Sequence, residues 1–341
     1  MNSYTRGKLG IMACDSGKPF AEKVFDELKK IIQKENHVAV SRIIQIKETK
    51  FSNGEIKTEI DESIRNQDVY IFQDVENKSS GLNVNDNIMA LKTAIQAAKM
   101  ADAQYVTAVI PAFPYARQDK PKTREGITAA MIARELEDAG ATRVITLDVH
   151  NEAIAGFFRK ANLENLRASK NLMNYIKEKL DLKDLVIVAP DAGGAARANF
   201  YAKNLGVKLA LIHKERDYSK ANAIDSMSLI GDVKGKNAFV VDDLIDTGGT
   251  VVNAAKKLKE FGAKKIYFAA SLALLNSPAL ERLDQAYKEG IITKVIGTNV
   301  IYHGEDLKKK HPWYEEVSVA KYFAKVIYNI NRGISISRLL D

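Results

Sequence analysis

Cysteine is nearly absent from this chain of 341 residues, whose one cysteine is Cys14. A single cysteine cannot form a disulfide within the chain, so nothing in the composition indicates secretion. The sequence also has no apolar run near the roughly 18 residues of a membrane span, and its first residues lack the apolar core of a signal peptide. These absences predict a cytoplasmic protein that has no membrane partner.

Two signatures of nucleic-acid binding are missing as well, namely zinc-finger spacing and a stripe of interleaved basic and aromatic residues. The chain is nevertheless basic, with 51 Lys and Arg against 43 Asp and Glu and a net charge of +8. Its basic residues are mostly scattered, apart from the triple Lys308-Lys309-Lys310. We therefore expect no nucleic-acid partner, and the excess of positive charge indicates phosphorylated small-molecule substrates.

Short apolar runs alternate with helical patterns along the whole chain. Tyr105–Ile110, for example, is a buried-strand pattern, and Ile127–Ala139 has helical spacing and ends at Gly140. This alternation predicts an α/β protein with mostly parallel sheets flanked by helices. The length suggests about two domains, and the pattern begins again near Asn165–Ser169, so the two halves look like a duplicated fold.

The most informative stretch covers residues 237–262. Ala238–Val241 predicts a buried strand, and the apolar spacing of Thr250–Phe261 predicts a helix that Gly262 ends. Between this strand and helix we expect a loop that contains three acids followed by Thr-Gly-Gly-Thr: Asp242, Asp243, Asp246, Thr247, Gly248, Gly249 and Thr250.

Such a strand–loop–helix joint suits a phosphorylated sugar. Backbone N–H groups and the positive end of the helix dipole favour an anion, and ionised acids accept hydrogen bonds from hydroxyls. The joint is not a P-loop, because the Gly-Lys-[Ser/Thr] element is missing and the acids precede the glycines. An N-capped helix after an acidic turn is the alternative, although three acids exceed what a cap needs.

Residues 240–250 read Val-Val-Asp-Asp-Leu-Ile-Asp-Thr-Gly-Gly-Thr and resemble the phosphoribosyl-pyrophosphate (PRPP) motif of the type I phosphoribosyltransferase fold. Further stretches make the chain similar to the ribose-phosphate pyrophosphokinase (PRPP synthetase) family. The resemblance implies two tandem phosphoribosyltransferase-like domains, one of residues 1–166 completed by 322–341 and one of 167–321. It also implies transfer of the β,γ-diphosphoryl group of ATP to the 1-hydroxyl of ribose 5-phosphate, which gives PRPP and AMP.

The resemblance places ribose 5-phosphate in the second domain. Residues 247–250 would hold the 5-phosphate, Asp242 and Asp243 would hold the ribose hydroxyls, and Asp246 would fix the loop. Asp191, in a second Gly-rich joint, is a further sugar-site candidate. Lys214 and Arg216 match the two catalytic cations of the family's flap, although a charge run after a strand is usually solvated surface.

Two other stretches match the family's ATP site. The first is Phe-Ser-Asn-Gly-Glu, where Phe51 would stack on adenine and Asn53 and Glu55 would read its edge; without this context, Asn-Gly predicts only a hairpin between residues 42–46 and 56–60. In the family this hairpin serves a neighbouring subunit, and members assemble as homohexamers, often through dimers. The second is Tyr-Ala-Arg-Gln-Asp at 115–119. It lies in the stretch 114–125, whose two Arg and two Lys alone predict an exposed basic loop, and the resemblance places Arg117, Gln118 and Arg124 near ATP.

His150 follows the strand predicted at Arg143–Val149 and matches the family's Asp-Leu-His, where the imidazole also contributes to the ATP site. A lone histidine is more often structural. The resemblance places Mg²⁺ near His150 and Asp191, and Mg²⁺ prefers hard oxygen ligands.

Three positions depart from the common family pattern: Ala155 replaces a Gln, and Arg338 and Leu340 replace two aromatic residues. In many members these regions form an allosteric site for phosphate and ADP, so inherited regulation is open. Two alternative functions are also open. A phosphoribosyltransferase would share the loop at 242–250 but would need no ATP loop, and a silent regulatory subunit would have no need of Lys214, Arg216 and His150.

Overall fold

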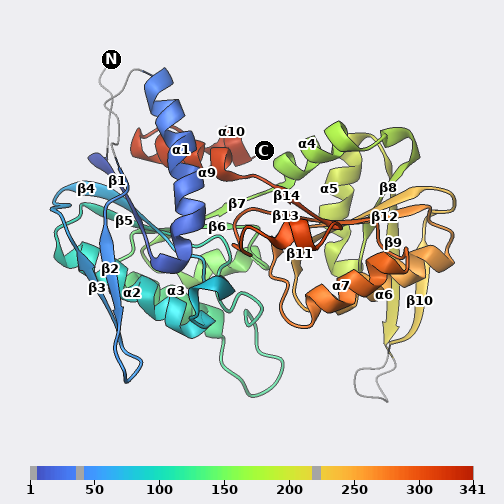
Figure 1. The fold of residues 1–341 in the computed structure, drawn as a ribbon, viewed down its shortest axis with the longest axis horizontal. Coiled ribbons are helices and arrows are strands. Elements are labelled where there is room, and N and C mark those ends of the chain that lie inside the picture. The colour runs from blue at the N-terminus through green and yellow to red at the C-terminus, as the bar shows by residue number, and fades with distance from the viewer. Residues whose placement is uncertain (1–5, 36–41, 217–223, 341) are drawn as a thin grey trace. The chain divides into compact units, whose positions relative to one another are not determined.

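The computed structural model describes residues 6–216 and 224–340 except 36–41, without the side chains of 214–216 and 224–226. The chain divides into two compact units (Figure 1). The first unit takes the described parts of Met1–Arg167, Asn299–Gly304 and Ser318–Asp341, and the second takes Ala168–Thr298 and Glu305–Val317. The first unit thus includes residues 299–304, which the sequence had assigned to the second domain.

The first unit is built on a five-stranded parallel sheet of order β1-β4-β5-β6-β7. The strands are β1 (Lys8–Ala13), β4 (Gln67–Phe72), β5 (Tyr105–Val109), β6 (Arg143–Leu147) and β7 (Asn162–Leu166). The helices are α1 (Lys18–Lys34), α2 (Val84–Met100), α3 (Thr128–Ala139), α9 (Ala320–Asn331) and the short α10 (Ser337–Leu340).

The C-terminal helix α9 completes the core of the first unit. Its Phe323 packs edge-on against Phe20 of α1, with ring centroids 5.0 Å apart, and both rings are buried. Phe20 also contacts Phe72 of the central strand β4. Such edge-to-face aromatic pairs stabilise a core beyond the area that they bury. Segments from both ends of the chain therefore share one hydrophobic core.

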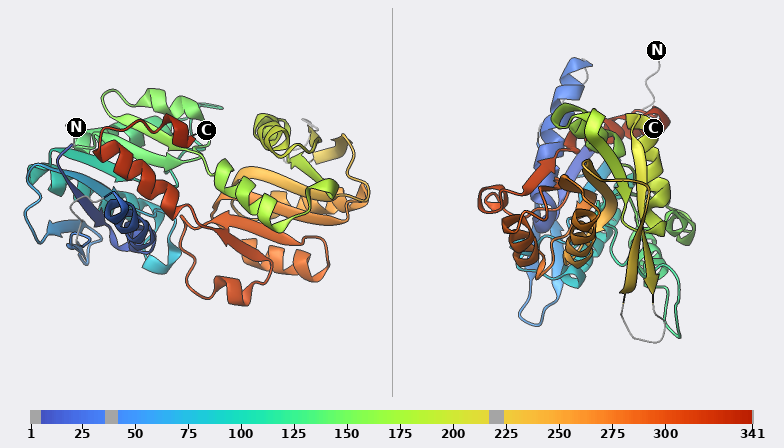
Figure 2. Two further views of the ribbon diagram at one scale, coloured as in Figure 1. Left: turned by 90° about the horizontal axis from the view of Figure 1, so that it is seen from above. Right: turned by 90° about the vertical axis from the view of Figure 1, so that its right-hand side faces the viewer.

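A separate hairpin of β2 (Ile46–Lys50) and β3 (Ile56–Ile60) leaves the first unit, and its tip projects from it (Figures 1 and 2). The hairpin rests on α2, where Thr58 Oγ1 lies 2.9 Å from Thr93 Oγ1 and Lys50 Nζ lies 2.8 Å from Asp86 Oδ2. Its first arm is Ile46–Lys50, so the prediction of 42–46 was wrong by four residues.

The second unit is built on a seven-stranded sheet of order β10-β9-β8-β11-β12-β13-β14, parallel except for the β10–β9 pair. The strands are β8 (Leu185–Ala189), β9 (Lys208–Arg216), β10 (Ile224–Ile230), β11 (Asn237–Ile245), β12 (Lys265–Ala273), β13 (Lys294–Thr298) and β14 (Tyr314–Val317). The helices are α4 (Ser169–Lys179), α5 (Ala195–Leu205), α6 (Gly249–Glu260), α7 (Ala279–Lys288) and α8 (Leu307–Lys310).

Both sheets confirm the α/β class. All five residues of β8 are buried and apolar, as expected for a strand covered on both faces of a parallel sheet. The sequence missed β7 and β14, which lie at the edges of their sheets and carry polar residues such as Asn162 and Glu315. Within the described residues, no helix is long and apolar enough to cross a membrane.

Candidate functional site

The order of strands reverses between β8 and β11 in the second unit. From β8 the chain passes through α5 to β9 on one side, and from β11 it passes through α6 to β12 on the other side. Loops that follow the carboxyl ends of two such strands diverge and leave a crevice where open α/β sheets bind ligands. The loop after β8 carries Asp191, and the loop after β11 carries residues 246–248.

Strand β11 continues through Asp242 and Asp243, which the sequence had placed in a loop. The strand runs on because β12 continues beside it, and Asp242 pairs with Ala270 in the parallel ladder. The two acids therefore lie on strand backbone within the sheet. The loop between strand and helix is short, with Asp246, Thr247 and Gly248.

Gly248 begins the turn into α6 with a left-handed backbone (φ +74°), which an L-residue adopts only with strain. In this described part of the chain, no side chain caps the helix that starts at Gly249. The first N–H groups of a helix have no partner inside the helix and attract anions. This end of α6 therefore has the geometry of a phosphate site.

Two neighbouring side chains form hydrogen bonds with the loop between β11 and α6. Asn276 Nδ2 donates to Asp246 Oδ1 at 2.8 Å, and Arg282 Nη1 donates to the Thr247 carbonyl at 3.1 Å. Asp246 is thus tied to the side chain of Asn276, in the segment that follows β12. The sequence analysis had named neither Asn276 nor Arg282.

Arg197 of α5 reaches the acid pair. Its Nη1 lies 3.1 Å from Asp242 Oδ1 and 3.3 Å from Asp243 Oδ1, and the Asp243 backbone N–H also donates to Asp242 Oδ1 at 2.9 Å. Burial, with the hydrogen bond and negative charge of Asp243, raises the pKa of Asp242 to about 7, while Arg197 opposes this rise. Two neighbouring carboxylates of this kind repel one another unless a cation or a hydrogen-bond donor faces them.

Asp191 lies at the other side of the crevice as the N-terminal cap of a short 3₁₀ turn, Ala192–Gly194. Its Oδ1 accepts a hydrogen bond from the Gly194 N–H at 3.1 Å, and the side chain is half-buried. The turn runs directly into α5, so the backbone that holds Asp191 also positions Arg197.

Lys214 and Arg216 lie on the backbone of β9 itself, whereas the sequence had placed them in a charge run after a strand. Lys214 is in register with Met227 of β10, and Arg216 is in register with Ile224. The side chains of both cations lie outside the described residues.

In the first unit, the hairpin tip carries Phe51, which is 46% exposed. The Phe51 N–H donates to the Glu55 carbonyl at 2.8 Å, and Asn53 Oδ1 accepts from the Glu55 N–H at 3.1 Å. Gly54 has φ +93°, as a tight turn requires. The turn therefore holds an aromatic face out in solvent.

The structure brings Arg117, Gln118 and His150 onto two adjoining loops at one edge of the first sheet. These loops follow the neighbouring parallel strands β5 and β6. Asn151 Nδ2 donates a hydrogen bond to the Asp119 carboxylate. This bond joins the two loops and holds the pKa of Asp119 below its usual range. Arg117, Gln118, Arg124 and His150 are all exposed.

No group of three or more His, Cys, Asp or Glu side chains poised for a metal occurs in the described parts of the chain. His150 and Asp191 belong to different units, so the fit to Mg²⁺ rests on donor chemistry. The Asp191 carboxylate supplies the hard oxygen that Mg²⁺ prefers, whereas an imidazole suits contact through water or through phosphate.

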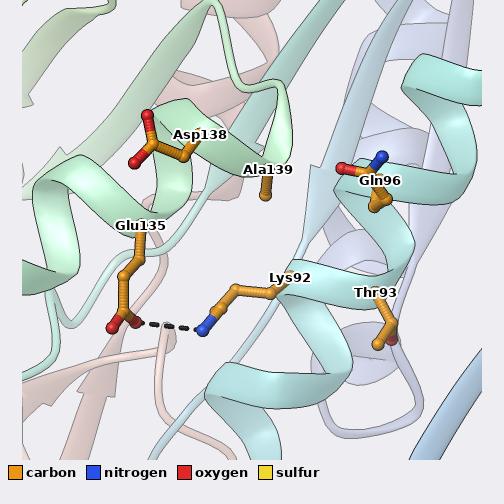
Figure 3. Close-up of a pocket in the computed structure, with 6 residues that line it drawn as sticks. All are labelled: Lys92, Thr93, Gln96, Glu135, Asp138 and Ala139. Atoms are coloured by element: carbon orange, nitrogen blue, oxygen red, sulfur yellow. Dashed lines mark hydrogen bonds and ion pairs between the residues drawn. The ribbon is translucent and has the colours of Figure 1, made fainter.

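A groove of about 340 Å³ lies between α2 and α3 (Figure 3). Lys92 and Glu135 form an ion pair across it, with Nζ 3.0 Å from Oε2. Thr93, Gln96, Asp138 and Ala139 complete its lining. None of these six residues is a predicted site residue, so the groove is separate from the candidate site.

Two family models match the chain. Residues 9–140 match the N-terminal domain of ribose phosphate pyrophosphokinase, and residues 160–308 match the phosphoribosyl transferase domain.

Relatives that match most of the chain are named as ribose-phosphate pyrophosphokinases. The chain is 39% identical to ribose-phosphate pyrophosphokinase 2 of Schizosaccharomyces pombe over 97% of its length and 99% of the relative's. It is 42% identical to ribose-phosphate pyrophosphokinase of Chlorobaculum tepidum over 85% of each chain. The crystal structure of phosphoribosylpyrophosphate synthetase from Mycobacterium smegmatis matches with a TM-score of 0.81 and 34% identity, over 96% of this chain and 99% of that chain. The two family models match one after the other along the chain, and the relatives match it over most of its length. The chain therefore belongs to the ribose-phosphate pyrophosphokinase family.

Proposed function

We propose that this protein transfers the β,γ-diphosphoryl group of ATP to the 1-hydroxyl of ribose 5-phosphate and releases PRPP and AMP. The observation that carries the proposal is the joint between β11 and α6. There an acid pair on strand β11 adjoins a glycine-led helix N-terminus at the switch point of a mostly parallel sheet. A sugar with hydroxyls at one end and a phosphate at the other matches both features.

The ribose 5-phosphate roles follow from this joint. The backbone N–H groups and hydroxyls of residues 247–250 hold the 5-phosphate, and Asp242 and Asp243 accept hydrogen bonds from the ribose hydroxyls. Asp246 keeps the loop in place through its hydrogen bond with Asn276. Asp191 supplies a further carboxylate at the neighbouring strand end.

The ATP roles belong to the first unit. Phe51 stacks on the adenine ring, and Asn53 and Glu55 contact the base edge. Arg117, Gln118 and Arg124 bind the phosphates together with His150, and the exposed guanidinium groups suit this task because each can bind phosphate oxygens in pairs.

The chemical step requires alignment and positive charge more than covalent help from the protein. Lys214 and Arg216 supply that charge to the migrating diphosphoryl group, where each cation contributes on the order of several kcal/mol of transition-state stabilisation. His150 and Asp191 would each contact Mg²⁺ directly or through water, and the metal would neutralise charge on the triphosphate.

Incubation of the pure protein with ATP, Mg²⁺ and ribose 5-phosphate tests this function. AMP that forms only when the sugar is present supports a PRPP synthetase. Pyrophosphate release from PRPP and a free base would instead identify a phosphoribosyltransferase, and binding without either turnover would identify a silent subunit.

We also propose that the protein self-associates, as a homohexamer built from dimers. The projecting hairpin supports this, since an exposed aromatic residue at its tip is suited to complete the adenine site of another copy (Figure 1). A cytoplasmic location, and the absence of nucleic-acid and membrane partners, stay predictions.

A further inference from the structure

Arg197 is a cation that the family resemblance did not assign, and it faces both acids of the proposed ribose site. It is the third residue of α5, which begins at the end of the β8 loop, and its side chain crosses the switch point to reach β11. A single nitrogen, Nη1, lies within hydrogen-bond distance of one oxygen on each acid. Arg197 therefore bridges Asp242 and Asp243.

We infer that Arg197 is a positioning residue that holds Asp242 and Asp243 side by side as acceptors for the ribose hydroxyls. This inference rests on the proposed binding of ribose 5-phosphate. Asp243 is nearly buried, with 12% of its side chain exposed, whereas 30% of Asp242 and 29% of Arg197 are exposed. Two carboxylates in such a place favour sharing a proton, and a protonated acid loses acceptor capacity.

The groups around the pair fix the sign of the effect. Burial is the largest cause that raises the pKa of Asp242. Asp243 raises this pKa further through a hydrogen bond and through its charge, and Arg197 lowers it. Without Arg197 the pair keeps a proton to higher pH. Ribose 5-phosphate then has to displace that proton before it binds, so its apparent affinity falls at neutral pH.

Arg197→Gln tests the inference, with Lys203→Gln as the matched control. Lys203 is exposed and lies on the same helix about 9 Å further along, so its loss removes equal charge from α5 without touching the acids. For Arg197→Gln we expect a KM for ribose 5-phosphate that rises severalfold, with a smaller change in kcat. We also expect the acidic limb of kcat/KM to move up by about one pH unit.

Arg197→Lys serves as the rescue variant. Because one nitrogen contacts both acids, an ammonium group is expected to replace it in large part and return the acidic limb toward the wild-type position. Calorimetric titration with ribose 5-phosphate alone measures the same loss without turnover. Arg197→Met, which keeps the aliphatic stem, replaces the Gln variant if that protein does not fold.

Several outcomes would overturn the inference. One is unchanged sugar affinity and an unmoved acidic limb in a folded Arg197→Gln protein. Another is a loss of kcat alone, or a lowered melting temperature with an unmoved limb, since a merely structural residue gives that result. If the wild-type protein makes no PRPP, it is the proposed function that fails, and the sugar titration of wild type and variant then judges Arg197 by itself.

Discussion

At the scale of single residues, the chemistry depends on where charges of each sign are placed. Carboxylates gather on one strand end beside Arg197, while the other proposed cations are carried by separate loops and by β9. In the proposed site, this placement would let the carboxylates accept from the ribose hydroxyls while cations on other elements face the triphosphate. Each group can therefore be tested by one substitution.

Lys214→Ala should lower turnover by orders of magnitude while ribose 5-phosphate binding survives. The reason is that a cation which faces the migrating diphosphoryl group acts mainly in the transition state. Single-turnover AMP formation and sugar titration measure the two quantities. A near-normal rate would remove Lys214 from catalysis.

Phe51→Ala should weaken ATP binding far more than sugar binding, because the exposed ring is proposed to stack on adenine. Phe51→Trp keeps an aromatic face and is the control, expected to bind ATP nearly as well as the wild type. Titration with a non-hydrolysable ATP analogue checks both variants. If the Ala variant binds the ATP analogue as tightly as the wild-type protein does, the hairpin tip has a purely structural role.

At the scale of elements, the turn into α6 is the most demanding piece of backbone. Gly248→Ala should lower the free energy of unfolding by about 1–2 kcal/mol, because Gly248 has a left-handed backbone conformation. The same substitution should also weaken ribose 5-phosphate binding. A Cβ there meets its nearest heavy atom at 3.5 Å, an ordinary contact, so strain rather than a clash sets the cost.

Gly206→Ala is the matched control for Gly248→Ala. Gly206 is also left-handed (φ +67°) and ends α5, and no heavy atom lies within 4 Å of the place that an added Cβ would take. Its substitution should cost a similar amount of stability and leave sugar binding intact. Chemical denaturation and sugar titration distinguish the two, and equal sugar affinity in both variants would contradict the role given to the turn.

A second element-scale feature is the segment 299–304, which Asp74 ties to the first unit. Asp74 Oδ2 accepts from the Tyr302 N–H at 2.8 Å, and Oδ1 accepts from the Glu76 N–H at 3.1 Å. Burial raises the pKa of Asp74 to about 7, with a smaller contribution from the charge of Glu76, against the lowering by these N–H groups.

Because the folded-state pKa of Asp74 lies above the unfolded value, the folded state binds the proton more tightly. The stability that Asp74 contributes is thus greatest below about pH 4 and is lost as pH rises through 7. Asp74→Asn should flatten the fall in stability between pH 5 and 8, by on the order of a few kcal/mol. Denaturant titrations at both pH values measure this, and an equally steep fall in the variant would exclude Asp74 as its source.

Much of this architecture follows from local pattern, and the rest depends on neighbours that local pattern does not contain. The apolar run at Val240 and the glycine at 248 were enough to predict the strand and the turn. The extension of β11 through Asp242 was missed, because it depends on pairing with β12, more than twenty residues further along. The contact of Arg197 with the acids was missed for the same reason, although its Gly-rich joint was recognised.

At the scale of the whole molecule, the proposed homohexamer predicts a particle of about six times the chain mass of 37.8 kDa. Light scattering coupled to gel filtration measures this mass across a range of protein concentrations. Phe51→Ala should leave the mass unchanged, since one exposed ring at a hairpin tip contributes to the adenine site more than to assembly. A stable monomer that retains full activity would contradict a site completed by another copy.

The most direct test is a structure of the protein determined with ribose 5-phosphate bound. We predict the 5-phosphate within hydrogen-bond distance of the backbone N–H groups of residues 247–250, and the ribose hydroxyls donating to Asp242 and Asp243. A sugar phosphate bound at any other place, with these acids and the start of α6 making no contact to it, would contradict the proposed site and the reaction built on it.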